Sequence, residues 1–291
     1  MELIIFLIVE LGIFFIIGAL AGFAAGLFGV GGGTIIVPLL FIVFTQMGYS
    51  PDNIMHLALG TSLATIIVTS ISSLMAHNKK GAVMWPVFKN LAPGLAIGCF
   101  FGAGIAGQIS GLYLQLIVGV FLLWVAYKML FGGKKPVASH ANDANGASNA
   151  SGVNHAHTAL PSKPKQLAAG GVIGIASAIF GIGGGSLTVP YLTRYGVVMQ
   201  KAVGTSAACG LPIAIAGALG FMLFGMQQQV DVPNTIGFVH IYAFLGISIM
   251  SFFTAKLGAK VAHILSPELL KKCFAVLLTV VGCYFFYKGL M

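Results

Sequence analysis

A glycine-rich stretch that occurs twice constrains the fold of this chain more than any other feature. Residues 26–40 read GLFGVGGGTIIVPLL and residues 178–192 read AIFGIGGGSLTVPYL, so a glycine triplet, a hydroxyl residue and a proline recur in register. Consecutive glycines interrupt a helix because their backbone loses more conformational entropy on ordering than that of other residues. Inside a membrane, a broken backbone is tolerated where protein or a water-filled cavity satisfies its polar groups. The repeat therefore predicts two paired breaks in membrane helices.

The sequence around the two breaks is that of an integral membrane protein. It is 58% hydrophobic and 7% charged, whereas soluble domains contain roughly 25% charged residues. The net charge of +9 comes from lysines and arginines in loops, as the positive-inside rule expects, and we predict no nucleic-acid partner. The four cysteines lack a C-x-x-C spacing, so we predict no metal site, no disulfide and no cofactor.

Ten apolar runs, in two groups of five, predict an all-α membrane fold. They lie at about 3–28, 34–47, 53–76, 86–107 and 112–131, and at about 167–182, 186–198, 202–226, 235–255 and 268–287. Eight of them approach or reach the roughly 17–25 residues of a spanning helix, and the two that follow the glycine motif are shorter. A polar interval rich in Ala, Ser, Asn and Gly separates the groups. We expect a first transmembrane repeat at 1–131, a flexible cytoplasmic linker at 132–166 and a second repeat at 167–291.

The charges of equivalent loops predict that the two halves are inverted relative to each other. Loop 77–89 holds three lysines, whereas its counterpart at 227–234 holds one aspartate and no cation. Loop 48–53 holds one aspartate, whereas its counterpart at 194–201 holds an arginine and a lysine. Five spans in each half place the cations, apart from Lys288, on the cytoplasmic side. We expect about ten helices as two inverted five-helix repeats in the inner or plasma membrane, with both termini on the outer side.

The doubled glycine motif also predicts an anion-binding site. In the inverted topology, the short helices after the motifs direct their N-termini toward each other inside the membrane. A helix N-terminus carries partial positive charge and unpaired N–H groups, which suit an anion. A repeated G-T-S segment, early in the third and eighth spans, adds hydroxyl groups. The predicted substrate-binding residues are Gly31, Gly32, Gly33, Thr34, Thr61, Ser62, Gly183, Gly184, Gly185, Ser186, Thr205 and Ser206.

Alternative explanations of the same residues stay open at this stage. The glycines alternatively serve only close helix packing, as in small-xxx-small contacts. The Thr-Ser pairs alternatively bond to the backbone of their own helices. If Thr34 and Ser186 are N-caps, Pro38 and Pro190 lack the N–H that would bond to their carbonyls, and the free carbonyls leave room for a coupling cation.

Ionisable residues inside apolar spans are candidates for coupling or access. Glu10 lies in the first span, His240 lies within the ninth, and Lys201 lies one turn before Thr205. Glu10 is a candidate proton carrier, with local pairing near the helix start as the alternative. Lys201 is a candidate for attracting anions, with topology marking as the alternative. The six acidic residues are scattered mostly in loops, so we predict no catalytic residues and no enzyme activity.

The twin F-G-[VI]-G-G-G-[TS]-x-x-V-P motifs, each followed by a G-T-S segment, resemble those of the sulfite exporter TauE/SafE family of membrane permeases. The resemblance covers both halves, and the family's paired motifs map onto Gly31 to Thr34 and Gly183 to Ser186. It implies a secondary transporter of small sulfur-containing anions such as sulfite, thiosulfate or organosulfonates, working by alternating access around the two breaks. The alternatives are a permease for another small anion such as a carboxylate, and a non-transporting membrane subunit that needs a partner. The expected partners are a small anionic substrate and membrane lipids. Three questions stay open: the direction of transport, whether a proton or cation is coupled to it, and whether the protein forms a homo-oligomer.

Overall fold

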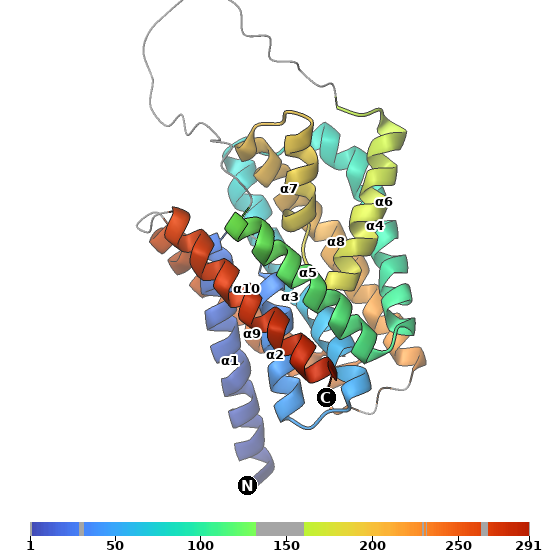
Figure 1. The fold of residues 1–291 in the computed structure, drawn as a ribbon, viewed down its shortest axis with the longest axis vertical. Helices are drawn as coiled ribbons and strands as arrows, with labels where there is room; N and C mark the ends of the chain where they lie inside the picture. Colours follow the sequence, from blue (N-terminus) through green and yellow to red (C-terminus); the bar gives the residue numbers. More distant parts are fainter. Residues whose placement is uncertain are drawn as a thin grey trace, which may run out of the picture.

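The computed structural model describes residues 2–28, 32–131, 160–228, 230, 232–262 and 267–290. Within these ranges the first half contains α1 (Glu2–Phe28), α2 (Gly33–Gln46), α3 (Pro51–Lys79), α4 (Trp85–Gln108) and α5 (Gly111–Phe131). The second half contains α6 (Lys163–Phe180), α7 (Gly185–Arg194), α8 (Met199–Gln227), α9 (Ile241–Ala262) and α10 (Pro267–Leu290). Two short strands, β1 (Thr235–Ile236) and β2 (Val239–His240), pair antiparallel between α8 and α9. The prediction of a helical fold is confirmed (Figure 1).

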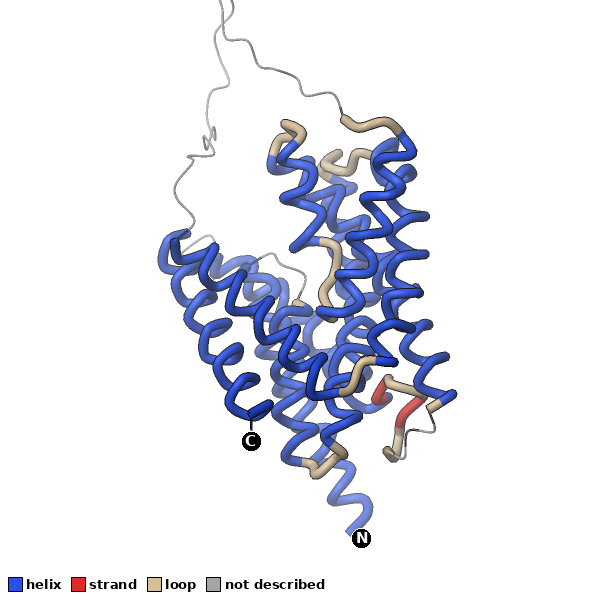
Figure 2. The backbone as a smooth tube through the Cα atoms, turned by 45° about the vertical axis from the view of Figure 1, so that its right-hand side comes forward, coloured by secondary structure: helices blue, strands red, loops and turns tan. Residues whose placement is uncertain are grey.

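The β-hairpin is a departure from the sequence prediction. The ninth apolar run was expected to be helical from about residue 235, but α9 begins at Ile241, so His240 lies in β2 and not within the ninth span. Asn234 and Gly237 have positive φ angles of 60° and 55°, which turn the chain twice within four residues and prevent a helix there. Figure 2 shows the hairpin in red, toward the end of the molecule where the N-terminus lies.

The start of α6 also differs from expectation. The helix begins at Lys163, inside the interval that was assigned to the linker. Ser162 occupies the N-cap position and a proline follows in the first turn, where its missing N–H would be unpaired in any case. Residues 132–159, which make up most of the predicted linker, lie outside the described residues.

The two short helices lie in opposite halves of the molecule. In Figure 1, α2 occupies the lower part and α7 the upper part, and each begins near the middle. α2 has 14 residues and α7 has 10, or roughly 20 Å and 15 Å of helix at 1.5 Å per residue. Neither is long enough to cross a hydrocarbon core of roughly 30 Å on its own.

Long helices surround these short ones, and glycines allow several of them to pack closely. α1 packs along α9 and α6 packs along α4, while α3 contacts α8 and α5 contacts α10. Gly22 of α1 lies against Ser251 of α9, and Gly98 of α4 lies against the backbone of Gly171 of α6. Small residues at such contacts let helix backbones approach, which is the main source of packing energy where the solvent is lipid.

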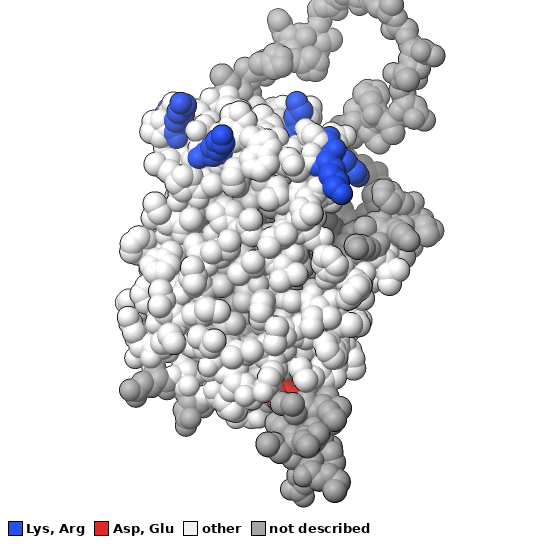
Figure 3. Space-filling view, turned by 180° about the vertical axis from the view of Figure 1, so that it is seen from behind, with Lys and Arg blue, Asp and Glu red and all other residues white. Residues whose placement is uncertain are grey.

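The outer surface has the composition of a lipid-facing surface. Among the described residues, four helices are long and apolar enough to span a membrane, at Pro51–Lys79, Trp85–Gln108, Gly111–Lys128 and Met199–Gln227. Large apolar side chains such as Phe101, Val120 and Val172 are more than half exposed on this surface. On the face in Figure 3, the lysine and arginine side chains that are drawn gather at one end, and an acidic side chain lies near the other. This segregation matches the charge pattern of a membrane protein.

The α4–α6 contact gives a matched test of glycine packing. A Cβ at Gly98 would overlap the backbone of Gly171, whereas a Cβ at Gly171 would meet nothing within 4 Å. We expect Gly98→Ala to lower stability by about 1–3 kcal/mol, the usual effect of overpacking. Gly171→Ala is expected to leave stability unchanged or raise it by up to about 1 kcal/mol through helix propensity. Thermal melting of the two purified variants in detergent measures the difference, and equal melting temperatures would contradict this account of the contact.

Candidate functional site

The two glycine motifs meet in the interior of the protein. A Cβ on Gly33 would lie 2.6 Å from the carbonyl oxygen of Gly181 and 3.0 Å from Cα of Ile182, so the start of α2 touches the turn between α6 and α7. The hydroxyl of Ser62 on α3 donates to the same carbonyl of Gly181 over 2.9 Å. Gly31 lies outside the described residues. The two predicted breaks therefore contact each other, through the start of α2 and the turn that follows α6.

The N-caps of α2 and α7 lie two residues before Thr34 and Ser186, the hydroxyl residues expected at these positions. Gly32 is the N-cap of α2, and its carbonyl accepts from the N–H groups of Ile35 and Ile36, each over 3.0 Å. Gly184 is the N-cap of α7. The expectation that Thr34 and Ser186 are N-caps is therefore wrong, because glycine backbones perform that role.

The first turns of α2 and α7 present backbone donors to the interior. The N–H groups of Gly33, Thr34, Gly185 and Ser186 belong to the first turn, where a helix supplies no carbonyl acceptor. Pro38 lies inside α2, so the carbonyl of Thr34 still lacks its usual i+4 donor. The breaks thus combine unpaired donors with an unpaired acceptor.

Several buried hydroxyls on the segments around the breaks have no hydrogen-bond partner among the described residues. They are those of Thr34, Ser177, Ser186, Thr188, Tyr191 and Ser206. A buried hydroxyl without a partner costs about 1–3 kcal/mol, so an isolated case is unfavourable and a group of six is unusual. Their positions, at the start of α2, the end of α6, in α7 and early in α8, indicate a site that is completed by a polar ligand or water.

The sequence prediction found only part of this group. Thr34, Ser186 and Ser206 were predicted, whereas Ser177, Thr188 and Tyr191 were not. Thr188 falls on a variable position of the doubled motif, and Ser177 precedes the motif by one turn. Only the packing of the turn after α6 against α3 and α8 reveals that their hydroxyls are buried without partners.

The threonines of the two G-T-S segments hold loops of the opposite half. Oγ1 of Thr61 accepts from the N–H of His240 over 3.0 Å, and Oγ1 of Thr205 accepts from the N–H of Met84 over 2.9 Å. These bonds reach other segments, not the helices on which the threonines lie. The predicted hydroxyls therefore divide into those that brace the protein, Thr61, Thr205 and Ser62, and those without a partner.

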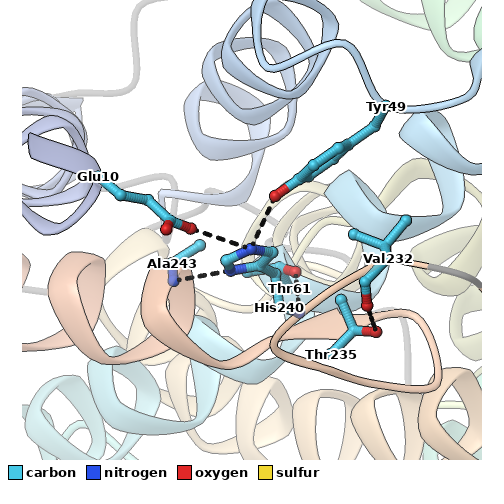
Figure 4. A network of polar contacts seen from close by, with 7 residues as sticks. All are labelled: Glu10, Tyr49, Thr61, Val232, Thr235, His240 and Ala243. Carbon is cyan, nitrogen blue, oxygen red and sulfur yellow. Dashed lines mark hydrogen bonds and ion pairs between the residues drawn. The ribbon is translucent and has the colours of Figure 1, made fainter. Parts of the chain in front are cut away.

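The predicted candidates Glu10 and His240 lie side by side (Figure 4). Nε2 of His240 lies 3.3 Å from Oε1 of Glu10, at ion-pair distance but outside hydrogen-bond geometry. The same nitrogen lies 3.2 Å from the hydroxyl of Tyr49, and Nδ1 accepts from the N–H of Ala243 over 3.3 Å. Glu10 is only 4% exposed and His240 is fully buried. Two residues that were singled out separately, on different elements, thus form one cluster.

A cavity of about 510 Å³ opens beside this cluster. Its lining residues are Glu10, Ile13, Gln46, Met47, Tyr49, Pro233 and Asn234. Tyr49 lies in the loop between α2 and α3, where burial, together with the nearby carboxylate of Glu10, raises the pKa of its hydroxyl to about 12. The Tyr49 hydroxyl therefore keeps its proton throughout the physiological range.

The remaining predicted residue, Lys201, lies apart from this cluster. It is exposed at the third position of α8, one turn before Thr205. Within the described ranges no group of three or more His, Cys, Asp or Glu side chains is arranged to hold a metal ion. His56 was not expected in the interior, but it is buried. Its ring nitrogens lie within 3.0 Å of the carbonyls of Asp52, Ala106 and Ile109.

Comparison with known proteins identifies the family. The sequence model described as sulfite exporter TauE/SafE matches residues 14–285, which is nearly the whole chain. The chain belongs to the sulfite exporter TauE/SafE family. It is therefore a transmembrane protein of a transporter family, and the resemblance seen in the doubled motif is confirmed.

Curated relatives carry matching descriptions. A probable membrane transporter protein of Haemophilus influenzae is 35% identical over 94% of this chain and 97% of its own length. The probable membrane transporter protein YunE of Bacillus subtilis is 25% identical, with 94% and 97% of the two chains covered. A probable membrane transporter protein of Xylella fastidiosa is 29% identical over 94% of this chain and 93% of its own length. No solved structure gives a significant match.

The unpartnered hydroxyls of this TauE/SafE protein give a test that separates binding from packing. Thr34→Val removes a hydroxyl that has no partner and keeps the side-chain shape, so we expect unchanged or higher melting temperature and weaker anion binding. Ser62→Ala removes the donor to Gly181 and is expected to lower stability by about 1–2 kcal/mol. Thermal-shift titration with thiosulfate measures both quantities. A loss of stability in Thr34→Val with unchanged binding would assign this hydroxyl to packing.

Proposed function

We propose that the protein is a secondary transporter of small sulfur-containing anions, working by alternating access around the two glycine breaks. The observation that carries the proposal is the contact of the α2 N-terminus with the turn that leads from α6 into α7, on segments that carry or adjoin six unpartnered buried hydroxyls. The family supports transport as the activity, and its description names sulfite. The proposed site consists of Gly31 to Thr34 and Gly183 to Ser186 with Ser206, to which we add Ser177 and Thr188.

The chemistry of this site favours an anion held by neutral donors. Helix N-termini stabilise negative charge through aligned peptide dipoles and unpaired N–H groups. Hydroxyl groups donate to oxyanions without adding a fixed charge, so the anion is released more readily than from a lysine or arginine. Sulfite, thiosulfate and sulfonates each present several oxygens to such donors. Two acidic residues whose side chains the structure describes lie elsewhere: Glu10 lines the cavity beside Tyr49, and Asp52 is in the first turn of α3.

We infer that the two halves are inverted repeats related by an approximate two-fold axis. Exchanging the first five helices with the last five maps the α1–α9 contact onto the α6–α4 contact, and the α2–α3 contact onto the α7–α8 contact. The bond from Met84 to Thr205 maps onto the bond from His240 to Thr61. These reciprocal pairs are what an inverted duplication requires, and such duplications are common in secondary transporters.

The same reciprocity extends to the glycines that precede the threonines. A Cβ on Gly60 would overlap the carbonyl of Phe238, and a Cβ on Gly204 would overlap the carbonyl of Ala82. In each half, therefore, the loop before the fourth helix packs into the G-T-S segment of the other half. This arrangement couples the halves mechanically, as the movement of one repeat against the other requires.

The two breaks differ in conformation, which supports alternating access. Gly32 has a φ of +78° at the start of α2, whereas its counterpart Gly184 has a φ of −55° at the start of α7. In an inverted-repeat transporter, the inward and outward states arise when the two repeats exchange conformations. We propose that the difference between Gly32 and Gly184 is part of that exchange.

Transport by the purified protein tests the substrate class. Proteoliposomes loaded with labelled thiosulfate, sulfite or taurine are expected to exchange label with unlabelled anion on the other side. Lactate and acetate serve as the carboxylate comparison. Exchange of carboxylates alone would replace the substrate proposal, and absence of exchange for every anion would favour a subunit that needs a partner.

Cysteine labelling tests the ten-span topology. In a cysteine-free background, Asp52→Cys at the start of α3 is expected to react with an impermeant maleimide added to intact cells. Lys80→Cys, just after the end of α3, is expected to react only after permeabilisation, since the positive-inside rule places it in the cytoplasm. Labelling of both positions from the same side would contradict a spanning α3, and the reverse pattern would invert the orientation.

A further inference from the structure

We propose that Glu10 binds the proton that couples transport to a pH gradient, and that the proton enters through the cavity lined by Glu10, Gln46, Tyr49 and Asn234. The proposal rests on the proposed transport function for what the proton drives. It concerns a different place in the fold from the glycine breaks. The cluster of Glu10, His240 and Tyr49 is called the coupling cluster below.

The position of Glu10 fits a group that exchanges a proton. Its carboxylate is 4% exposed, and Oε1 has no aligned hydrogen-bond partner. A buried carboxylate without full compensation favours binding a proton, because the neutral acid avoids the desolvation penalty. The adjoining cavity of about 510 Å³ provides a path for water to the carboxylate. An ionisable residue inside a membrane helix with access to water is typical of proton relays in transporters.

The geometry of His240 directs the proton to the carboxylate. Nδ1 accepts from the N–H of Ala243, so this nitrogen has no proton, and the neutral ring carries its proton on Nε2. A second proton on Nδ1 would face the backbone donor of Ala243. The Nε2–H donates to the hydroxyl of Tyr49 over 3.2 Å, and Oε1 of Glu10 lies 3.3 Å from the same nitrogen without hydrogen-bond alignment. Glu10 is therefore the member of the cluster that gains and loses the proton, and His240 is a positioning residue.

The coupling cluster is connected to both helix breaks. Glu10 lies on α1, which leads directly into the first glycine motif. The N–H of His240 donates to Thr61, and the next residue, Ser62, donates to Gly181 in the second motif. Protonation of Glu10 removes the charge that attracts the Nε2–H and weakens the link between α1 and the segment before α9. The contact between α1 and α9 is one of several between the two halves, so its strength bears on their relative movement.

The helices and loops packed against the cluster carry other titratable groups, which we compare with Glu10. Those with described side chains are Tyr49, Asp52, His56, His77, Lys79, Lys201, Cys209, Tyr242, Lys272, Cys283, Tyr284, Tyr287 and Lys288, and those without are Glu2, Asp231, Lys256, Lys260, Glu268, Lys271 and Cys273. Asp52 is exposed, and both ring nitrogens of His56 face backbone carbonyls. The ring of Tyr242 contacts that of His240 at 6.3 Å between centroids, without a hydrogen bond from its hydroxyl to the cluster. Asp52, a carboxylate at the start of α3, is the natural control.

Proteoliposomes containing the full chain test the proposal with thiosulfate as the probe. The membrane potential is clamped with potassium and valinomycin, sodium is absent, and a pH gradient is imposed in either direction. The wild type is expected to accumulate thiosulfate with one direction of the gradient. We expect Glu10→Gln to accumulate about tenfold less thiosulfate, which is the order of a typical coupling between sites. The variant is expected to retain thiosulfate exchange. Asp52→Asn is expected to behave as the wild type.

Infrared difference spectroscopy between acid and neutral pH gives a second readout that needs no transport. We expect the spectra of the wild type and of Asp52→Asn to contain one C=O stretch of a protonated acid that is missing from the spectrum of Glu10→Gln, whereas the bands of the other acidic residues remain in that variant. Accumulation that persists in Glu10→Gln would overturn the proposal, and so would a Glu10→Gln spectrum that keeps every C=O band of the wild type. If the wild type moves thiosulfate but never accumulates it with a pH gradient, the coupling is wrong and the transport function stands. If the wild type moves no anion, the transport function fails, and the infrared band alone decides whether Glu10 binds a proton.

Discussion

The structure depends on how two interrupted helices satisfy their backbone inside a membrane protein. Each break leaves first-turn N–H groups without intrahelical acceptors, and hydrocarbon offers none. The protein brings the breaks together, so that Gly33 packs on Gly181 and Ser62 donates to the Gly181 carbonyl, while the first-turn N–H groups stay without intrahelical acceptors. Glycine is needed at this contact because a side chain on Gly33 would occupy the space of the opposing backbone. Close packing of the motif at Gly33 is thus compatible with the proposed binding role, since the two roles use different groups: the missing side chain and the backbone N–H groups.

The hydroxyl groups on the segments around the breaks have different roles. Four of the predicted hydroxyls lie in G-T-S segments, and two of them, Thr61 and Thr205, fix the loop of the opposite half by accepting a backbone N–H. Accepting an N–H leaves the hydroxyl proton of each threonine free, whereas Ser62 donates its proton to the Gly181 carbonyl. The hydroxyls without a partner are the stronger candidates for the proposed site, because nothing within the described residues accounts for their burial.

The helical architecture could be predicted from the sequence because apolar runs of spanning length permit few alternatives to helices in lipid. The exceptions are informative. Asn234 and Gly237 turn the chain where hydrophobicity alone suggested a helix, so His240 lies in a strand. The pairing of Glu10 with His240 was not predictable, since it joins residues at opposite ends of the sequence through the α1–α9 contact. Nor was the loss of partners at Ser177 and Thr188, which depends on packing between three helices.

The coupling cluster joins Glu10 and Tyr49 of the first half to His240 of the second, and the residues that two-fold exchange gives for Glu10 and His240 are not ionisable. Two-fold exchange maps His240 onto Met84, which shares its backbone bond to a threonine but carries a thioether that neither binds nor donates a proton. Aligned on Phe28 and Phe180, Glu10 maps onto Ser162, the N-cap of α6. The backbone scaffold is therefore duplicated while the ionisable side chains are not. In a protein whose halves exchange conformations, identical halves would give two states of equal energy, and an ionisable group in one half alone makes their difference in energy depend on protonation.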